Sequence, residues 1–161
     1  MFYISVDQSF TSTGFCIFND TKMVTCGVIK STKTEDPFFR AHQISTELSK
    51  IANKYNARIV VLEGLAFAKL GNATRDLAGL QYTIIHQLRF IDGIELKIVT
   101  PNEVKRTATG RGNARKDEMV DALPANIRAE FDKLKAKKTT GLYDLSDAYW
   151  IGKTIQIQEI N

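Results

Sequence analysis

The sequence contains few of the residues that mark disulfide-rich, fibrous or membrane-spanning proteins. It has two cysteines, three prolines and ten glycines among 161 residues. No uncharged apolar run approaches the roughly 20 residues needed to span a bilayer. These shortages argue against a disulfide scaffold, a collagen-like chain and a helical membrane protein. With 43% hydrophobic residues the chain can bury one sizeable core, and it is too short for two ordinary domains, so we expect one domain over residues 1–161.

Two further absences concern location and cysteine chemistry. The chain starts directly with a strand-like segment and lacks the basic flank, apolar stretch and cleavage site of a signal peptide, so we expect a cytoplasmic protein. Cys16 and Cys26 do not have the spacing of a metal-binding motif. We expect two buried, reduced thiols, which lie near each other if residues 13–19 and 23–30 form a hairpin.

Basic charge is concentrated in one short segment. The net charge is +4, but residues 105–116 alone contribute +5 and contain no acid, which leaves −1 for the rest of the chain. The five basic residues are Lys105, Arg106, Arg111, Arg115 and Lys116. Such a segment on a near-neutral body is typical of a protein that contacts phosphates. A solvated loop has the same composition, and charge alone does not separate the two.

Hydrophobic periodicity predicts a mixed α/β chain. Alternating and apolar runs indicate strands, and apolar residues spaced by threes and fours indicate helices. The predicted strands are 2–7, 14–18, 23–29, 58–63 and 96–100, and the predicted helices are 38–55, 73–90, 102–108, 115–131 and 143–156. Three strands in meander order, followed by alternating helices and strands, predict a mixed sheet with helices on its faces.

Four acids occupy positions in the sequence that indicate a catalytic role rather than a role in solubility. Asp7 ends the first strand, Glu63 ends the most apolar strand, and Asp144 and Asp147 share one face of the last helix. Acids at strand ends meet at the sheet edge where active sites form. Four adjacent carboxylates repel one another, and two divalent cations remove that conflict. Ligands that are all oxygen select Mg²⁺ or Mn²⁺ rather than zinc.

Each acid, taken alone, also fits a plainer role. Asp7 suits a turn residue that bonds to the backbone of Ser9. Asp144 suits a helix N-cap with Asp147 in the first turn, where the helix dipole favours an acid. Glu63 is harder to assign this way, because a charge that ends a buried strand needs a partner. The joint pattern is what favours a metal-dependent site.

In this order and spacing, the motifs resemble the RuvC family of Holliday-junction resolvases, within the ribonuclease H-like nuclease superfamily. The matching stretches are Ile4-Ser-Val-Asp7 with Gly14, Val61-Leu-Glu63, Val104-Lys-Arg-Thr107, Gly110-Arg-Gly112, Ala114-Arg-Lys116 and Asp144-Leu-Ser-Asp147-Ala148. The resemblance implies a ribonuclease H-like α/β fold. Its mixed five-stranded sheet would have a three-strand meander, then parallel strands, and helices on both faces.

The resemblance also implies an activity and a site. The protein would resolve four-way DNA junctions by paired, metal-dependent nicks that leave 5′-phosphate and 3′-hydroxyl ends. Asp7, Glu63, Asp144 and Asp147 would be the catalytic carboxylates that bind two Mg²⁺ ions, for which Mn²⁺ can substitute. Lys105 and Lys116 align with family basic residues that serve the DNA backbone and the active site. The protein would be a homodimer with helix 73–90 as the candidate interface, although core packing explains the apolar face of that helix equally well.

The remaining DNA contacts follow from charge and loop position. Lys116 would stabilise charge on the scissile phosphate or simply position it. The other candidates are Lys105, Arg106, Arg111 and Arg115 on backbone phosphates, with Phe67 and Lys69 in the loop after Glu63. The family carries an aromatic residue where this chain has Ala66, so Phe67 stands one position away from the expected one.

This departure and many others suggest a divergent, phage-encoded member, located in a bacterium or a phage-infected cell. Two alternatives stay open: a broader endonuclease for forks, three-way junctions and flaps, and a non-catalytic junction-binding protein on the same fold. A P-loop NTPase does not fit, because no Ser or Thr follows Lys116. Sugar kinases and actin-like ATPases share the sheet type but need a second lobe.

Overall fold

The sheet confirms the predicted mixed five-stranded architecture. The computed structural model describes residues 1–65, 72–137 and 141–160. Its five strands lie in the order β3-β2-β1-β4-β5. They are β1 (Phe2–Asp7), β2 (Thr13–Asn19), β3 (Lys22–Ile29), β4 (Ile59–Glu63) and β5 (Glu95–Val99). The first three strands form the antiparallel meander, and β4 pairs in parallel with both β1 and β5.

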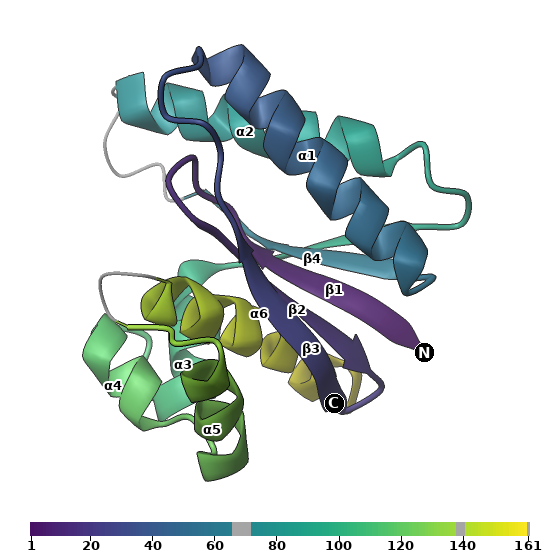
Figure 1. Cartoon of the computed structure of the whole chain (residues 1–161). Helices are drawn as coiled ribbons and strands as arrows, with labels where there is room; N and C mark the ends of the chain where they lie inside the picture. The colour runs from purple at the N-terminus through teal and green to yellow at the C-terminus, as the bar shows by residue number, and fades with distance from the viewer. Residues whose placement is uncertain (66–71, 138–140, 161) are drawn as a thin grey trace.

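Helices cover both faces of this sheet (Figure 1). They are α1 (Pro37–Lys54), α2 (Asn72–Leu88), α3 (Pro101–Thr109), α4 (Lys116–Asp121), α5 (Ala125–Lys133) and α6 (Leu142–Ile160). The pair α1 and α2 lies on one face, and α3 to α6 lie on the other. β4 is buried along nearly its whole length for this reason, which explains its continuous apolar run. No helix in the described part of the chain combines the length and the apolar character needed to cross a membrane.

One predicted helix is wrong in its extent. The apolar period over residues 115–131 predicts a single helix, but the chain forms α4 and α5 with a break at Leu123 and Pro124. Proline lacks the backbone N–H that a helix interior needs, and it disfavours helical geometry in the residue before it. Pro124 is therefore the N-cap residue that immediately precedes α5, and α4 ends before it.

α6 is held across the middle of the sheet by short contacts. The Ser5 hydroxyl donates to the Ala148 carbonyl at 2.6 Å, and the Tyr3 hydroxyl donates to the Gly152 carbonyl at 3.1 Å. A Cβ on Gly152 would lie 2.4 Å from the ring of Phe18, so only glycine permits this approach. These contacts fix the position of the start of α6 beside the ends of β1 and β4.

Candidate active site

Two neighbouring parallel strands end together, and each ends in an acid. Val6 of β1 is aligned with Leu62 of β4, so the next residues, Asp7 and Glu63, lie at the same edge of the sheet. The turn role considered for Asp7 is not the one observed, because the Ser9 N–H donates to the Thr13 hydroxyl at 3.2 Å. Strand pairing therefore brings together two acids that are far apart in sequence.

The first turns of α6 bring two more acids to this edge. Asp144 lies in the first turn of the helix, which begins at Leu142, so it is not the N-cap. β2 approaches this turn so closely that a Cβ on Gly14 would lie 2.2 Å from the Asp144 carbonyl oxygen. Asp147 follows one turn later and is 13% exposed. The close approach of Gly14 is what places both helix acids beside Asp7.

The four acids influence one another electrostatically. Burial raises the pKa of Asp7 well above its ordinary value, and the negative charges of Asp147, Glu63 and Asp144 add to that rise. Burial, followed by Asp147, raises the pKa of Glu63 to about 7. Burial is also the main cause of the raised pKa of Asp147, and Asp144 adds to it. A buried cluster of this kind needs positive charge before all its members ionise at neutral pH.

Lys116, the first residue of α4, supplies part of that charge. Its Nζ lies 3.0 Å from Asp147 Oδ2 and 5.7 Å from the centre of the Tyr143 ring. Burial acts to lower the pKa of Lys116, but the carboxylates of Asp147, Asp7 and Asp144 outweigh burial and the pKa is raised. Lys116 is therefore a fully charged counterion of the acids.

Several neutral side chains hold the acids in place. The Ser12 hydroxyl donates to Asp144 Oδ2 at 2.7 Å. The amide groups of Gln8 and Gln81 both donate to the Glu63 backbone carbonyl at 2.8 Å. Sequence reasoning missed all three residues. Gln8 and Ser12 flank the polar stretch after Asp7, which is a usable signal, whereas nothing in the helical pattern distinguishes Gln81.

The basic segment divides into two groups in the structure. Lys105 acts on the acids, because its charge lowers the pKa values of both Glu63 and Asp147. Arg111 and Arg115 instead lie beside Glu118, with nitrogen–oxygen distances of 2.5 and 3.8 Å. Arg106 is exposed on α3. Phe67, Lys69 and Ala66 lie outside the described residues.

A cavity of about 320 Å³ adjoins the acids, and its lining indicates which kind of ligand could bind there. Asp7, Glu63 and Gln8 line it. Gln8 Oε1 is buried and has no hydrogen-bond partner among the described residues, so it suits a water or a ligand donor in this cavity. Among the described residues, no three carboxylate, imidazole or thiol groups are placed closely enough to hold a metal ion together. The donor set nevertheless fits a hard cation, because four carboxylates face only partial compensation from Lys116 and Lys105.

Comparison with known protein families identifies the family of this chain. The family model for crossover junction endodeoxyribonuclease RuvC matches residues 3–151, a span that includes all four acids. The chain belongs to the RuvC family. A RuvC of Ehrlichia canis is 28% identical over 148 residues, covering 90% of this chain and 89% of that protein. A RuvC of Prochlorococcus marinus is 26% identical and covers 99% of this chain and 98% of its own length.

Solved RuvC structures and other resolvases share the fold. Thermus thermophilus RuvC superposes with a TM-score of 0.76 at 17% identity, over 99% of this chain and 96% of that one. The fowlpox virus resolvase in complex with Holliday junction DNA gives a TM-score of 0.61 at 16% identity, over the whole of both chains. The predicted ribonuclease H-like fold is thereby confirmed. The RuvC family is a family of endonucleases that are, in general, metal-dependent.

Proposed function

We propose that this protein cleaves four-way DNA junctions by paired nicks. The observation that carries the proposal is the convergence of Asp7, Glu63, Asp144 and Asp147 around Lys116 at the ends of β1 and β4. Within a family of junction endonucleases, this is the arrangement that a phosphodiester-cleaving site requires. The basic segment beside the acids is also suited to bind the phosphates of a four-way junction. We assign the activity to the cytoplasm.

We further propose that the four carboxylates hold two Mg²⁺ ions, with Mn²⁺ as a substitute. When bound, such ions activate the attacking water and stabilise the leaving 3′ oxygen, which leaves a 5′-phosphate. Ser12 orients Asp144, and the two glutamine amides fix the backbone at Glu63. Lys116 forms an ion pair with Asp147, and in this position its charge would also help to neutralise the scissile phosphate.

The DNA path follows the basic residues. We propose that Lys105 contacts the phosphate nearest the acids and that Arg106, exposed on α3, contacts the next. Arg111 and Arg115 would reach DNA after release from Glu118, and Phe67 and Lys69 complete the proposed contacts. Because these residues bind phosphates, we expect affinity to fall steeply with salt and to depend little on sequence.

A labelled immobile junction tests the proposed activity. The junction and a linear duplex of the same sequence are incubated with the protein in Mg²⁺, Mn²⁺ or EDTA at moderate salt. We expect metal-dependent paired nicks near the branch point and an intact duplex. Cleavage of forks and flaps at the same rate would establish the broader endonuclease instead. Tight binding without nicks in either metal would leave the non-catalytic binder and overturn the proposal.

Acidification should stabilise the metal-free protein. Glu63 has a pKa of about 7 in the fold and an ordinary value of 4.5, so its contribution to stability is complete below pH 4.5 and is lost as the pH rises to 7. A shift of this size corresponds to at most about 3 kcal/mol. The raised pKa values of Asp7 and Asp147 act in the same direction. Urea unfolding in EDTA at pH 5 and pH 8 measures the difference.

Two comparisons control this pH experiment. Glu63→Gln should show a smaller loss of stability between pH 5 and pH 8, because the amide does not ionise. Millimolar Mg²⁺ should restore the stability of the wild-type protein at pH 8, because binding to the native state alone stabilises it. An equal loss in both proteins would contradict the raised pKa of Glu63, and no response to Mg²⁺ would contradict the proposed cation site.

The dimer, which we propose forms through α2, must use a different face from the one expected. The apolar stripe Leu80, Ile84 and Leu88 packs into the core with α1 and the sheet, so core packing accounts for it. Exposed aromatic side chains remain on α2 and directly after it: Tyr82 of α2 is 73% exposed, and Phe90, two residues past the end of α2, is 75% exposed. We propose that this exposed side of α2 forms the interface.

Tyr82→Glu should convert the protein to a monomer. A charge buried without a partner opposes association, and a two-fold interface would bury it in both protomers. Sedimentation velocity at micromolar concentration compares the variant with the wild type and with Leu134→Glu. Leu134 is 51% exposed and follows α5 on the opposite face of the sheet, so its substitution should leave the mass unchanged. A monomeric wild type, or a dimeric Tyr82→Glu, would reject this interface.

A further inference from the structure

The two cysteines are directly opposite each other on neighbouring strands. Cys16 of β2 pairs with Cys26 of β3 in the antiparallel register. Both contact the core on the face covered by α3 to α6, so their side chains leave the sheet on the same side. Opposite residues of an antiparallel pair have Cα atoms about 4.5–5.5 Å apart. This spacing lies within the range of about 4.4–6.8 Å that disulfides require.

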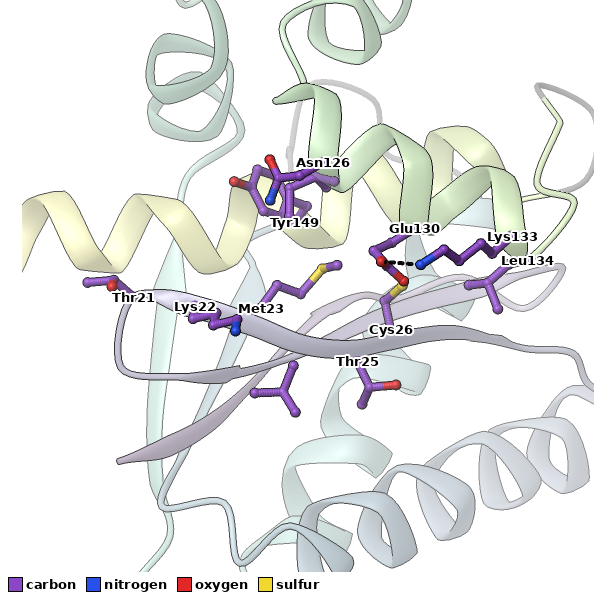
Figure 2. A pocket seen from close by; sticks show the side chains of 12 residues that line it. Thr21, Lys22, Met23, Thr25, Cys26, Asn126, Glu130, Lys133, Leu134 and Tyr149 are labelled. Carbon is purple, nitrogen blue, oxygen red and sulfur yellow. Dashed lines mark hydrogen bonds and ion pairs between the residues drawn. The ribbon is translucent and has the colours of Figure 1, made fainter.

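The two thiols differ in their surroundings. Cys16 is completely buried, and its Sγ lies 3.9 Å from the Leu145 carbonyl of α6. Cys26 is partly exposed and lines a cavity of about 690 Å³ between β3 and α5. Figure 2 shows its side chain pointing toward α5, beside the ion pair of Glu130 and Lys133. A small reagent entering this cavity therefore meets Cys26 first.

The thiols also differ in acidity. The neighbouring Cys16 thiol lowers the pKa of Cys26, although burial and the charge of Glu130 oppose this. Burial raises the pKa of Cys16 well above its ordinary value. The thiolate is the reactive form of cysteine, and redox-sensitive thiolates are accessible and adjacent to a second, resolving cysteine. Cys26 has the attributes of the attacking thiol, and Cys16 those of the resolving one.

We propose that Cys16 and Cys26 form a redox-active dithiol that a peroxide oxidises to a disulfide across β2 and β3. The Cys26 thiolate attacks one peroxide oxygen, the O–O bond breaks, and hydroxide leaves and is protonated to water. Cys26 is then a sulfenic acid. Cys16 loses its proton and attacks the Cys26 sulfur, the S–O bond breaks, and a second water leaves. Two electrons pass from the sulfurs to the peroxide, and both thiol protons end in water.

Hydrogen peroxide applied to the reduced full-length protein tests this site. We expect both thiols to be lost, the intact mass to fall by two hydrogen atoms, and a peptide map to join Cys16 to Cys26 within one chain. Dithiothreitol should restore both thiols. Retention of the two thiols, or a disulfide that links two chains, would overturn the proposal.

Single substitutions separate the two roles. In Cys26→Ser, Cys16 should keep its thiol under the same exposure to peroxide. In Cys16→Ser, Cys26 should be trapped as a sulfenic acid by dimedone. Because a buried substitution at Cys16 risks the fold, the native wild-type protein is also alkylated with iodoacetamide, which should label Cys26 well before Cys16. Equal labelling rates, or oxidation of Cys16 in Cys26→Ser at the wild-type rate, would contradict the assigned order.

Discussion

Asp7→Asn should abolish junction cleavage and leave junction binding intact. The charges of the other three acids all raise the pKa of Asp7, so its carboxylate belongs to the cluster that would hold the proposed cations. We expect the rate to fall by roughly a thousandfold or more, which corresponds to about 4 kcal/mol of lost transition-state stabilisation. Cleavage of a labelled junction and a binding titration in Ca²⁺ or EDTA measure the two effects separately.

The same substitution should not destabilise the fold. Asparagine has nearly the same shape as aspartate, and it removes one negative charge from a buried cluster in which the other acids raise the pKa of Asp7. The thermal midpoint of the metal-free variant at neutral pH should therefore equal or exceed that of the wild type. Asp92→Asn, at an exposed acid outside the cluster, is the matched control and should cut normally. Retained cleavage by Asp7→Asn, or lost binding, would refute the mechanism.

Gly14→Ala should disrupt the site through the backbone. The added Cβ would lie 2.2 Å from the Asp144 carbonyl oxygen and 2.5 Å from its carbonyl carbon. Both partners are main-chain atoms, so the first turn of α6 must move away from β2. We expect a loss of about 1–3 kcal/mol in the free energy of unfolding, as for other overpacked sites. A displacement near 1 Å of Asp144 and Asp147 should lower cleavage by about a hundredfold.

Gly79→Ala provides the control for this experiment. At Gly79 of α2, an added Cβ would have no atom within 4 Å apart from its chain neighbours and the backbone of its own helix, and alanine favours the helix by up to about 1 kcal/mol. Urea unfolding and junction cleavage are measured for both variants. If Gly14→Ala matched the wild type in stability and rate, the close approach of β2 to α6 would not be what positions the helix acids.

The positions of the acids could be predicted because they depend on local patterns of the chain. Asp7 and Glu63 close apolar runs, and parallel strand ends meet at one edge whatever the loops between them do. The spacing of Asp144 and Asp147 is a property of a single helix. These features need only the strand and helix periods, which the sequence carries.

The supporting contacts could not be predicted, because they depend on tertiary packing. Lys116 meets Asp147 across 31 residues, and Ser12 meets Asp144 across 132. The ion pairs of the basic segment are a further example: its composition predicts five positive charges, and the structure adds that Glu118 pairs with Arg111 and Arg115.

The helices likewise include one feature that the sequence could predict and one that it could not. The apolar stripe of α2 indicated a buried face correctly but could not say whether the core or a second subunit buries it, and the core does. In contrast, the break between α4 and α5 was readable from Pro124, because its effect on the chain is local.

The long sequence separation of the proposed site residues implies that the ability to cut DNA is acquired late in folding. The first acid lies at the end of β1, and two others lie on α6, which is joined to β1 by contacts that span 143 and 149 residues. Contacts between such distant segments form only after a large loss of chain entropy, so they complete late in folding. In a chain that is still emerging from the ribosome, or in one whose α6 has detached by partial unfolding, the four carboxylates are far apart. Such a chain would not be able to cleave DNA.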